Sequence, residues 1–335
     1  MLTLLLLLQA TVPQRPAQLT RFLEQSIGLD AAQLAAVERN EPVVKVLETR
    51  DRRDVAVFGI ITVAVSREAW AQAMRSFPAS LRTPNRAKLG VFSRPATAQD
   101  VAGVTVHERD VAEMRSCKPA DCVAKMPASD MRRIHDEINW SAAPREQQEQ
   151  LSGYARRRFV EYVTDYRARG DSALTVYDDR GNVTVRASAA FADQLAESPF
   201  VYQNVPSLRE YLGNYPRGPL PGDASEVLFW SEDVLPRLRP ILSMTHQIVY
   251  TPPELPAVTL VAAKQIYANH YFETALDLTM AIDRGPGLYL LVLRRYRFDN
   301  LPGGILNIRG RAIGALRDQL VLDLRRQQTA SEPPR

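Results

Sequence analysis

The sequence predicts an α+β protein in which a curved antiparallel sheet grips a long C-terminal helix, a helix-grip-like arrangement. Segments that alternate apolar and polar residues, as half-buried strands do, fill much of the last third of the chain. An amphipathic segment, 301–325, follows these strands and predicts the final helix. A mainly helical stretch at about 110–170 separates two strand-rich parts, which predicts a helical insertion in the sheet domain.

The composition is that of an ordinary globular protein. The chain has 335 residues, of which 45% are hydrophobic and 24% charged. This length allows about two domains, or one large domain with insertions. With only two cysteines a disulfide scaffold is excluded, so a sizeable hydrophobic core must hold the fold together. No apolar run reaches the ~18 residues that a membrane span needs.

The N-terminus predicts a signal peptide or leader at residues 1–15. Residues 4–8 are all leucine and Ala10 follows, as in the apolar part of a secretory signal and its cleavage region. No basic residue precedes the leucines, so a weak anchor and a buried first helix stay open as alternatives. We expect export to the bacterial periplasm or secretion.

The two cysteines agree with export. Cys117 and Cys122 flank a short loop that contains Pro119, and such a loop can bring two Cβ atoms within bonding distance. In an oxidising compartment the pair would form a structural disulfide bond. A redox pair and half of a metal site are the alternatives, but a redox motif is usually Cys-x-x-Cys, and a second cysteine pair to complete a zinc site is lacking.

The first half of the chain begins with a helical lead-in at 16–50, which holds helices at 16–27 and 30–39 and a strand at 43–48. Asp30 is the expected N-cap of the second helix. The main domain, 51–326, starts with a strand at 54–65, and Ser66 caps the helix at 67–76. Strand pieces at 89–92 and 104–107 follow. The insertion holds helices at 110–115 and 129–140 and a longer one that starts at Pro144 and ends at Gly170.

The second half is mainly strands. Strands at 174–178 and 183–186 form a hairpin, and helices at 189–197 and 207–214 follow. Four strands are then expected at 227–231, 241–250, 258–282 and 288–298, before the closing helix. Residues 327–335 form a polar, flexible tail.

The strand at 258–282 carries the unusual chemistry. Alternate residues of a strand face opposite sides, and its even positions are apolar except for Lys264, His270 and Thr274. The rows of the neighbouring strands likewise place His246 and Arg294 among apolar residues. A buried, unpaired cation is costly, so these groups need partners, water or a cavity.

Our hypothesis is a cavity lined by Leu, Met, Tyr and Phe side chains, with a basic polar end. His246, Lys264, His270 and Arg294 would bind the polar or acidic head of an amphipathic ligand, and Tyr250 lies in the same row as His246. The alternative is structural. A strand this long should bend or bulge, near residues 268–269, and a bulge would reverse the alternation and place Lys264 or Arg294 in water.

The charge gives little reason to expect a nucleic-acid partner. The net charge is +4, and the densest arginine clusters are 156–158 and 294–297. Neither cluster is accompanied by an aromatic stacking motif or a nucleic-acid fold signature. The arginines are also scattered among acidic residues. The expected partner is therefore a hydrophobic or amphipathic small molecule, with peripheral membrane contact as an open option.

A family resemblance adds to this interpretation. The segment from Val55 through Ser66-Arg-Glu-Ala-Trp70 resembles the strand-to-helix opening of START-like (SRPBCC) helix-grip domains. The resemblance covers about 55–110 and 170–325, and it implies a curved sheet that grips the last helix around a hydrophobic cavity. The Cys-x4-Cys loop and the segment Tyr267-Ala-Asn-His-Tyr-Phe272 also resemble uncharacterised secreted bacterial proteins.

Motifs that name a reaction are missing from the sequence. There is no Gly-x-Gly-x-x-Gly, phosphate-binding loop, nucleophile elbow or His-Glu-x-x-His. His246 and His270 would bind a metal with Glu273 only if the strand parity changed between them. We expect ligand binding without a cofactor or metal. The alternatives are an envelope scaffold that binds a protein partner, and a small cyclase or hydrolase in the same cavity that uses His246 or His270 as a base.

Overall fold

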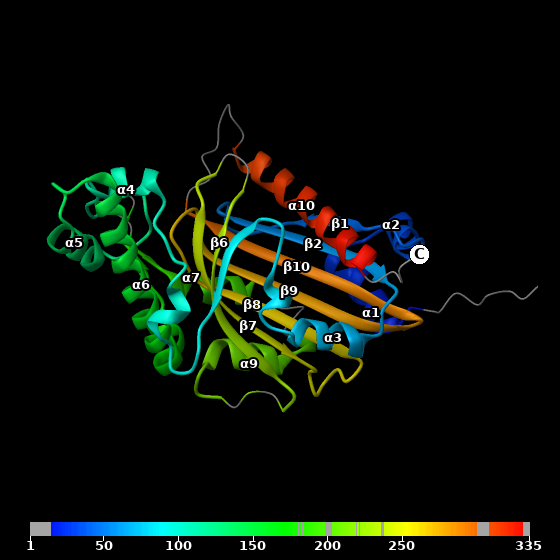
Figure 1. The fold of residues 1–335 in the computed structure, drawn as a ribbon. Coiled ribbons are helices and arrows are strands. Elements are labelled where there is room, and N and C mark those ends of the chain that lie inside the picture. Colours follow the sequence, from blue (N-terminus) through cyan, green and yellow to red (C-terminus); the bar gives the residue numbers. More distant parts are fainter. Residues whose placement is uncertain are drawn as a thin grey trace, which may run out of the picture.

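The computed structural model describes residues 15–179, 181, 184–197, 203–218, 220, 222–235, 238–299 and 308–330. Its central element is an eight-stranded sheet in the order β1-β2-β10-β9-β8-β7-β6-β3, in which every neighbouring pair is antiparallel (Figure 1). The strands are β1 (Val43–Leu47), β2 (Asp54–Val63), β3 (Arg86–Val91), β6 (Ser225–Asp233), β7 (Ile241–Tyr250), β8 (Val258–Ala268), β9 (Phe272–Gly285) and β10 (Gly287–Phe298). The predicted α+β class is confirmed.

Helices cover both faces of the sheet. On one face, the α10 face, α10 (Ile308–Ala330) crosses β1 and β2, and α3 (Arg67–Arg75) packs on β7, β8 and β9. On the other, the α6 face, lie α1 (Ala17–Arg21), the π-helical turn η1 (Phe22–Ile27), α2 (Ala31–Glu38), α6 (Pro144–Arg169), α7 (Ala187–Ala196) and α9 (Pro206–Asn214). The sheet is therefore the middle layer of three, which explains why β2 is buried along its whole length.

The C-terminal helix packs closely because of one glycine. Leu320 and Leu324 of α10 are fully buried against Val55, Val57 and Ile61 of β2. A Cβ atom at Gly59 would lie 2.9 Å from both leucine side chains, so any other residue here would force these side chains to shift. Each leucine contributes about 2–3 kcal/mol by its burial.

The strand predicted at 258–282 is a hairpin, and the single long strand is wrong. β8 ends at Ala268, and residues 269–271 turn the chain into β9. Tyr271 adopts a left-handed backbone (φ 64°), and the Asn269 side chain accepts a hydrogen bond from the Leu242 amide at 2.9 Å. The break lies where the sequence predicted a bend or bulge, near residues 268–269, but it is a turn without glycine or proline, and the predicted reversal of the alternation is wrong. Ala262 pairs with Leu278, so even-numbered residues of both strands still share one face.

The expected helical insertion forms a lobe at one end of the sheet (Figure 1). It contains α4 (Glu108–Met114), α5 (Ala128–Glu137) and α6, with a core of its own that includes Met114, Met131 and Ile134. The two-stranded ribbon β4 (Val176–Tyr177) and β5 (Val185–Arg186) follows, much shorter than the predicted hairpin. Short 3₁₀ turns lie at η2 (Ala79–Leu81), η3 (Ala98–Val101) and η4 (Gly170–Ala173).

Local capping signals predicted helix boundaries well. Asp30 caps α2 with a full capping box, and the Ser66 hydroxyl accepts a hydrogen bond from the Ala69 amide at 3.1 Å. Pro144 begins α6. Gly170 ends it with φ 57°, where a Cβ would lie 1.7 Å from the Tyr215 carbonyl oxygen. Both the conformation and the space therefore require glycine.

Several predicted boundaries are different in the structure. Residues 104–107 form a connection rather than a strand. The lead-in 16–50 adds β1 to the main sheet and packs its helices on it, so it is part of the same core. α10 continues to Ala330, four residues into the predicted tail. Residues 1–14, most of the predicted leader, and 301–307 lie outside the described residues.

Candidate functional site

The structure brings only part of the predicted basic site together. His246, Tyr250 and Lys264 lie on the α6 face, and His246 is directly opposite Lys264 in the pairing of β7 and β8. Arg294 points to the α10 face, because the even positions of β10 share that face. His270 lies in the turn after β8, beside the helical lobe. The five side chains therefore do not line one cavity, and their role in ligand binding stays a prediction.

His246 is fully enclosed by hydrogen-bonding partners. Its Nδ1 lies 3.1 Å from the Tyr166 hydroxyl, and its Nε2 lies 3.0 Å from Glu226 Oε2 and 3.3 Å from the Tyr211 hydroxyl. Burial, and then the charge of Lys264, lower the pKa of His246 to about 3. The ring is therefore neutral. With its proton on Nε2, it donates to Glu226 and accepts from Tyr166.

Lys264 is compensated as well. Its side chain is 1% exposed, and its ammonium group forms an ion pair with Asp171 and lies 3.9 Å from the centre of the Phe191 ring. Burial lowers the pKa of Lys264, and the charge of Asp171 opposes this effect. Tyr250, the third member of the row, lies 3.4 Å from the Ser207 hydroxyl. A ligand head would have to displace an existing partner at each of these positions.

His270 fastens the helical lobe to the sheet. Its Nε2 lies 2.9 Å from Asp110 Oδ2 of α4, and its Nδ1 lies 3.1 Å from the Val123 carbonyl oxygen. Burial would raise the pKa of Asp110, but His270 and Arg239 lower it below its usual value. The neighbouring Asn269 and Tyr271 also bind other segments, since the Lys125 amide donates to the Asn269 carbonyl and the Arg239 amide to the Tyr271 hydroxyl.

Arg294 joins β10 to the C-terminal helix. Its guanidinium lies 2.7 Å from Asp323 of α10 and 3.8 Å from Asp277 of β9. The other clustered arginines are also used inside the chain. Their ion pairs are Arg156–Glu149, Arg157–Glu137, Arg158–Asp130, Arg295–Glu197 and Arg297–Asp54. These arginines therefore contribute to intramolecular contacts.

An apolar groove of about 370 Å³ lies elsewhere on the α6 face, between the N-terminal helices and the far ends of β8 and β9. Its apolar lining is Leu19, Phe22, Leu255, Val258, Met280, Ile282 and Leu291. Its polar lining residues are Gln18, Asn204, Glu254 and Asp283. The Asp283 carboxylate turns to Arg67 of α3, 3.0 Å away on the α10 face, whereas Glu254 accepts hydrogen bonds from the backbone and side chain of Ser207.

The sequence held a partial signal for this groove. Met280 and Ile282 belong to the even row that drew attention to the strand, and Leu19 and Phe22 belong to a predicted helix. These residues come together only through tertiary packing, because α1 and η1 pack on strands that follow more than 200 positions later in the sequence. Leu255 comes from a proline-rich connection for which periodicity gives no orientation.

The predicted disulfide between Cys117 and Cys122 is present, with a Cα–Cα distance of 4.4 Å. It closes the loop between α4 and α5. Beside it, the Ala120 and Cys122 amides donate hydrogen bonds to the carbonyl groups of Asp178 and Asp179. Among the described residues, groups of three or more His, Cys, Asp and Glu side chains that could hold a metal ion are not found. In the same part of the chain, no helix is both long and apolar enough to cross a membrane.

The arrangement thus separates two kinds of chemistry. The predicted basic residues are occupied by ion pairs and hydrogen bonds within the chain, whereas the groove on the α6 face is mainly apolar and carries the Glu254 carboxylate. In comparisons with known proteins, the chain matches no protein-family model, no curated protein and no solved structure, so its resemblance to START-like domains stays a prediction.

Proposed function

We propose that this protein binds an apolar or amphipathic, lipid-like molecule in the groove between the N-terminal helices and β8–β9. The observation that supports the proposal is the combination of size and lining. A volume of about 370 Å³ lies within the ~300–1,000 Å³ of small-molecule sites, and the wall is mainly aliphatic with one phenylalanine. Apolar burial of a chain in this groove would supply most of the binding free energy.

The rim favours a ligand whose head is neutral or cationic. Burial raises the pKa of Glu254, but hydrogen bonds from its own backbone amide and from the amide and hydroxyl of Ser207 lower it below its usual value, so the carboxylate is charged at neutral pH. The Asp283 carboxylate does not add to this charge, because Arg67 of α3 holds it on the α10 face of the sheet. An anionic head would meet like charge here, which differs from the acidic head expected from the sequence alone.

Export is part of the proposal. The buried disulfide supports an oxidising compartment such as the periplasm, because cytosolic thiols are kept reduced. Intact mass spectrometry of protein made in a secreting bacterial host tests this point. We expect the loss of an N-terminal segment and of two hydrogen atoms from the cysteine pair; an uncleaved chain with two free thiols would contradict export.

Binding can be tested with fluorescent 1-N-phenylnaphthylamine and three competitors that share one chain: dodecanol, dodecyltrimethylammonium and dodecanoate. We expect the probe to bind, and the first two competitors to displace it at about fivefold lower concentration than dodecanoate, the effect of up to ~1 kcal/mol from exposed charges. Glu254→Gln should reduce the difference in displacing concentration between dodecanoate and the other two competitors. Denaturation of protein purified without detergent, followed by solvent extraction and mass spectrometry, would identify a resident lipid.

A matched pair of variants locates the site. Ala257 is exposed and lines the groove, so Ala257→Trp should fill it and abolish probe binding without disturbing the core. Ala87 is exposed on β3 at the edge of the sheet, and Ala87→Trp should leave probe binding unchanged. Equal binding to both variants, or no binding to the unmodified protein, would overturn the proposal.

A further inference from the structure

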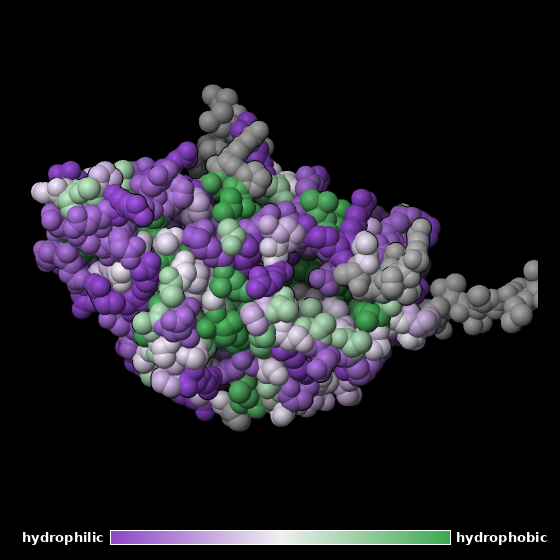
Figure 2. All heavy atoms as spheres, viewed as in Figure 1, coloured by the Kyte–Doolittle hydropathy of each residue, from purple (hydrophilic) through white to green (hydrophobic). Residues whose placement is uncertain are grey.

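A second cavity lies where the helical lobe meets the sheet, away from the groove. It has a volume of about 80 Å³ and is lined by residues of α4, α5, α6 and β7 and of the turn after β8. Figure 2 shows that the outer surface of the lobe is mostly hydrophilic in this view, so the apolar side chains of the lobe gather inside it. The apolar lining includes Met114, Met126, Met244, Phe159, Leu151 and Leu242.

The hydroxyl of one tyrosine in this lining makes no hydrogen bond of normal geometry. Tyr154 of α6 is 6% exposed and lines the cavity, and its hydroxyl oxygen is buried without a hydrogen bond of acceptable geometry. Such a group is costly, about 1–3 kcal/mol, and buried polar groups in native proteins are rarely left unpaired. Burial, and then the charge of Asp130 and a side-chain interaction with it, raise the pKa of Tyr154, so the hydroxyl stays protonated, and a ligand acceptor would compete with the Asp130 carboxylate for its proton.

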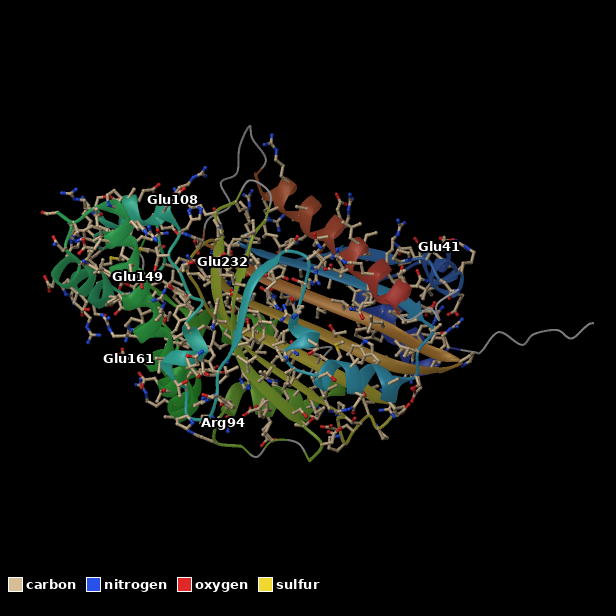
Figure 3. The ribbon with its side chains drawn as sticks, in the orientation of Figure 1. Glu41, Arg94, Glu108, Glu149, Glu161 and Glu232 are labelled. Atoms are coloured by element: carbon tan, nitrogen blue, oxygen red, sulfur yellow. A yellow bond between two sulfur atoms is a disulfide. The ribbon has the colours of Figure 1, made fainter. Side chains whose placement is uncertain are left out.

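The charged side chains beside the cavity neutralise each other. Asp130 lies 3.1 Å from Nε of Arg158, and Arg158 also pairs with Glu161 on the solvent side of α6 (Figure 3). An ionised ligand would therefore find no free counter-charge in this lining. Three methionines adapt readily to the shape of an occupant.

We propose that this cavity binds a small uncharged molecule with one hydrogen-bond acceptor, such as a cyclic ketone, held by the Tyr154 hydroxyl. A buried water needs about 10–15 Å³ by the same measure, so 80 Å³ corresponds to about six waters or a ligand of about six non-hydrogen atoms. The remainder of the ligand packs on methionine and aromatic side chains. The site is independent of the groove, because the two share no lining residue.

The test uses two probes of equal shape, cyclopentanone and methylenecyclopentane, titrated calorimetrically into the full-length protein. The ketone should bind about fivefold more tightly, the effect of ~1 kcal/mol expected from one buried hydrogen bond. Tyr154→Phe should abolish this preference while it leaves hydrocarbon binding unchanged. Ala155→Leu, which fills a lining position on α6, should abolish binding of both probes.

Three results would overturn the proposal. If neither probe binds the unmodified protein, the cavity holds only water. If both bind equally, the hydroxyl does not select the ligand. If Tyr154→Phe keeps the preference for the ketone, another group supplies the hydrogen bond. Circular dichroism and the thermal midpoint of each variant distinguish loss of the site from loss of the fold.

Discussion

The α6 helix presents three buried tyrosines to the sheet, and their hydroxyl groups have different surroundings. Tyr162 donates to the Ile266 carbonyl at 2.6 Å and accepts from the Thr175 amide at 3.0 Å. Tyr166 binds His246 at 3.1 Å. Tyr154, two to three turns earlier on the helix, has no such partner. One helix face thus contains a completed polar network at one end and an open polar position at the other.

This difference distinguishes buried polar groups that stabilise the fold from a buried polar group that could bind a ligand. Around His246 and Lys264 the donors and acceptors are paired and space is filled, so the network fixes the position of α6, α9 and β7. Around Tyr154 the lining is mostly apolar, space remains, and the hydroxyl makes no hydrogen bond of normal geometry. A charged residue at a position that the sequence predicts to be buried therefore indicates an ion-pair or hydrogen-bond partner within the protein more often than a ligand. Substitution of these partners tests this conclusion directly.

The largest effect should come from breaking the Lys264–Asp171 pair. Asp171→Asn leaves the buried ammonium without its carboxylate, which should lower the free energy of unfolding by about 3–5 kcal/mol. Lys264→Met combined with Asp171→Asn replaces the pair by an apolar and a neutral group and should cost much less. Urea denaturation of the single and double variants measures the coupling, and purely additive effects would show that the pair is not compensated by charge.

The next effect concerns pH and His246. The unfolded protein binds a proton at this histidine below pH ~6.5, whereas the folded protein does so only near its pKa of about 3. Stability therefore decreases as the pH falls through this window, by about 2 kcal/mol between pH 6.5 and 4.5 for this group alone. His246→Gln should remove about 1.4 kcal/mol per pH unit from the slope of the free energy of unfolding. An unchanged slope would contradict a neutral, buried ring.

Glu273 provides a control of opposite sign. Burial raises the pKa of Glu273 to about 7 against the attraction of Arg53 and Lys125, so the folded protein binds a proton there that the unfolded protein has released. Its contribution to stability is present below the unfolded pKa of ~4.5 and is lost as the pH rises toward 7. Glu273→Gln should therefore steepen the rise of the free energy of unfolding with pH that His246 causes. A shallower rise would contradict a raised pKa for Glu273.

The fold was largely accessible from the sequence because local signals agreed with it. Asp30, Ser66, Pro144 and Gly170 mark helix ends through their own backbone and hydrogen-bonding preferences. The break near 268–269 was also predicted, but that it is a complete turn was not, because residues 269–271 are held by contacts with Leu242 and Arg239, far away in the sequence. Local pattern cannot report such contacts.

The site was harder to predict for a similar reason. Strand alternation correctly placed His246 and Lys264 on one face but not their partners Glu226 and Asp171, which come from other elements. The sequence pattern grouped Arg294 with them, although Arg294 faces the other side of the sheet. The face that Arg294 takes depends on how β10 pairs with β9, and an irregularity between Gly287 and Leu288 shifts this pairing. A cavity is the space that remains after the elements pack together, and the hydrophobic periodicity of a single element does not predict where this space lies.

The smallest effect compares two chemically identical changes on one helix. Tyr166→Phe leaves Nδ1 of His246 buried and unpaired, so it should lower the free energy of unfolding by about 1–3 kcal/mol. Tyr154→Phe removes a hydroxyl that already lacks a partner, so stability should change by less than about 0.5 kcal/mol or increase. Urea denaturation of both variants at pH 7 provides the measurement. An equal loss in both would mean that the Tyr154 hydroxyl is already satisfied in the free protein, and the contrast between the two ends of α6 would then disappear.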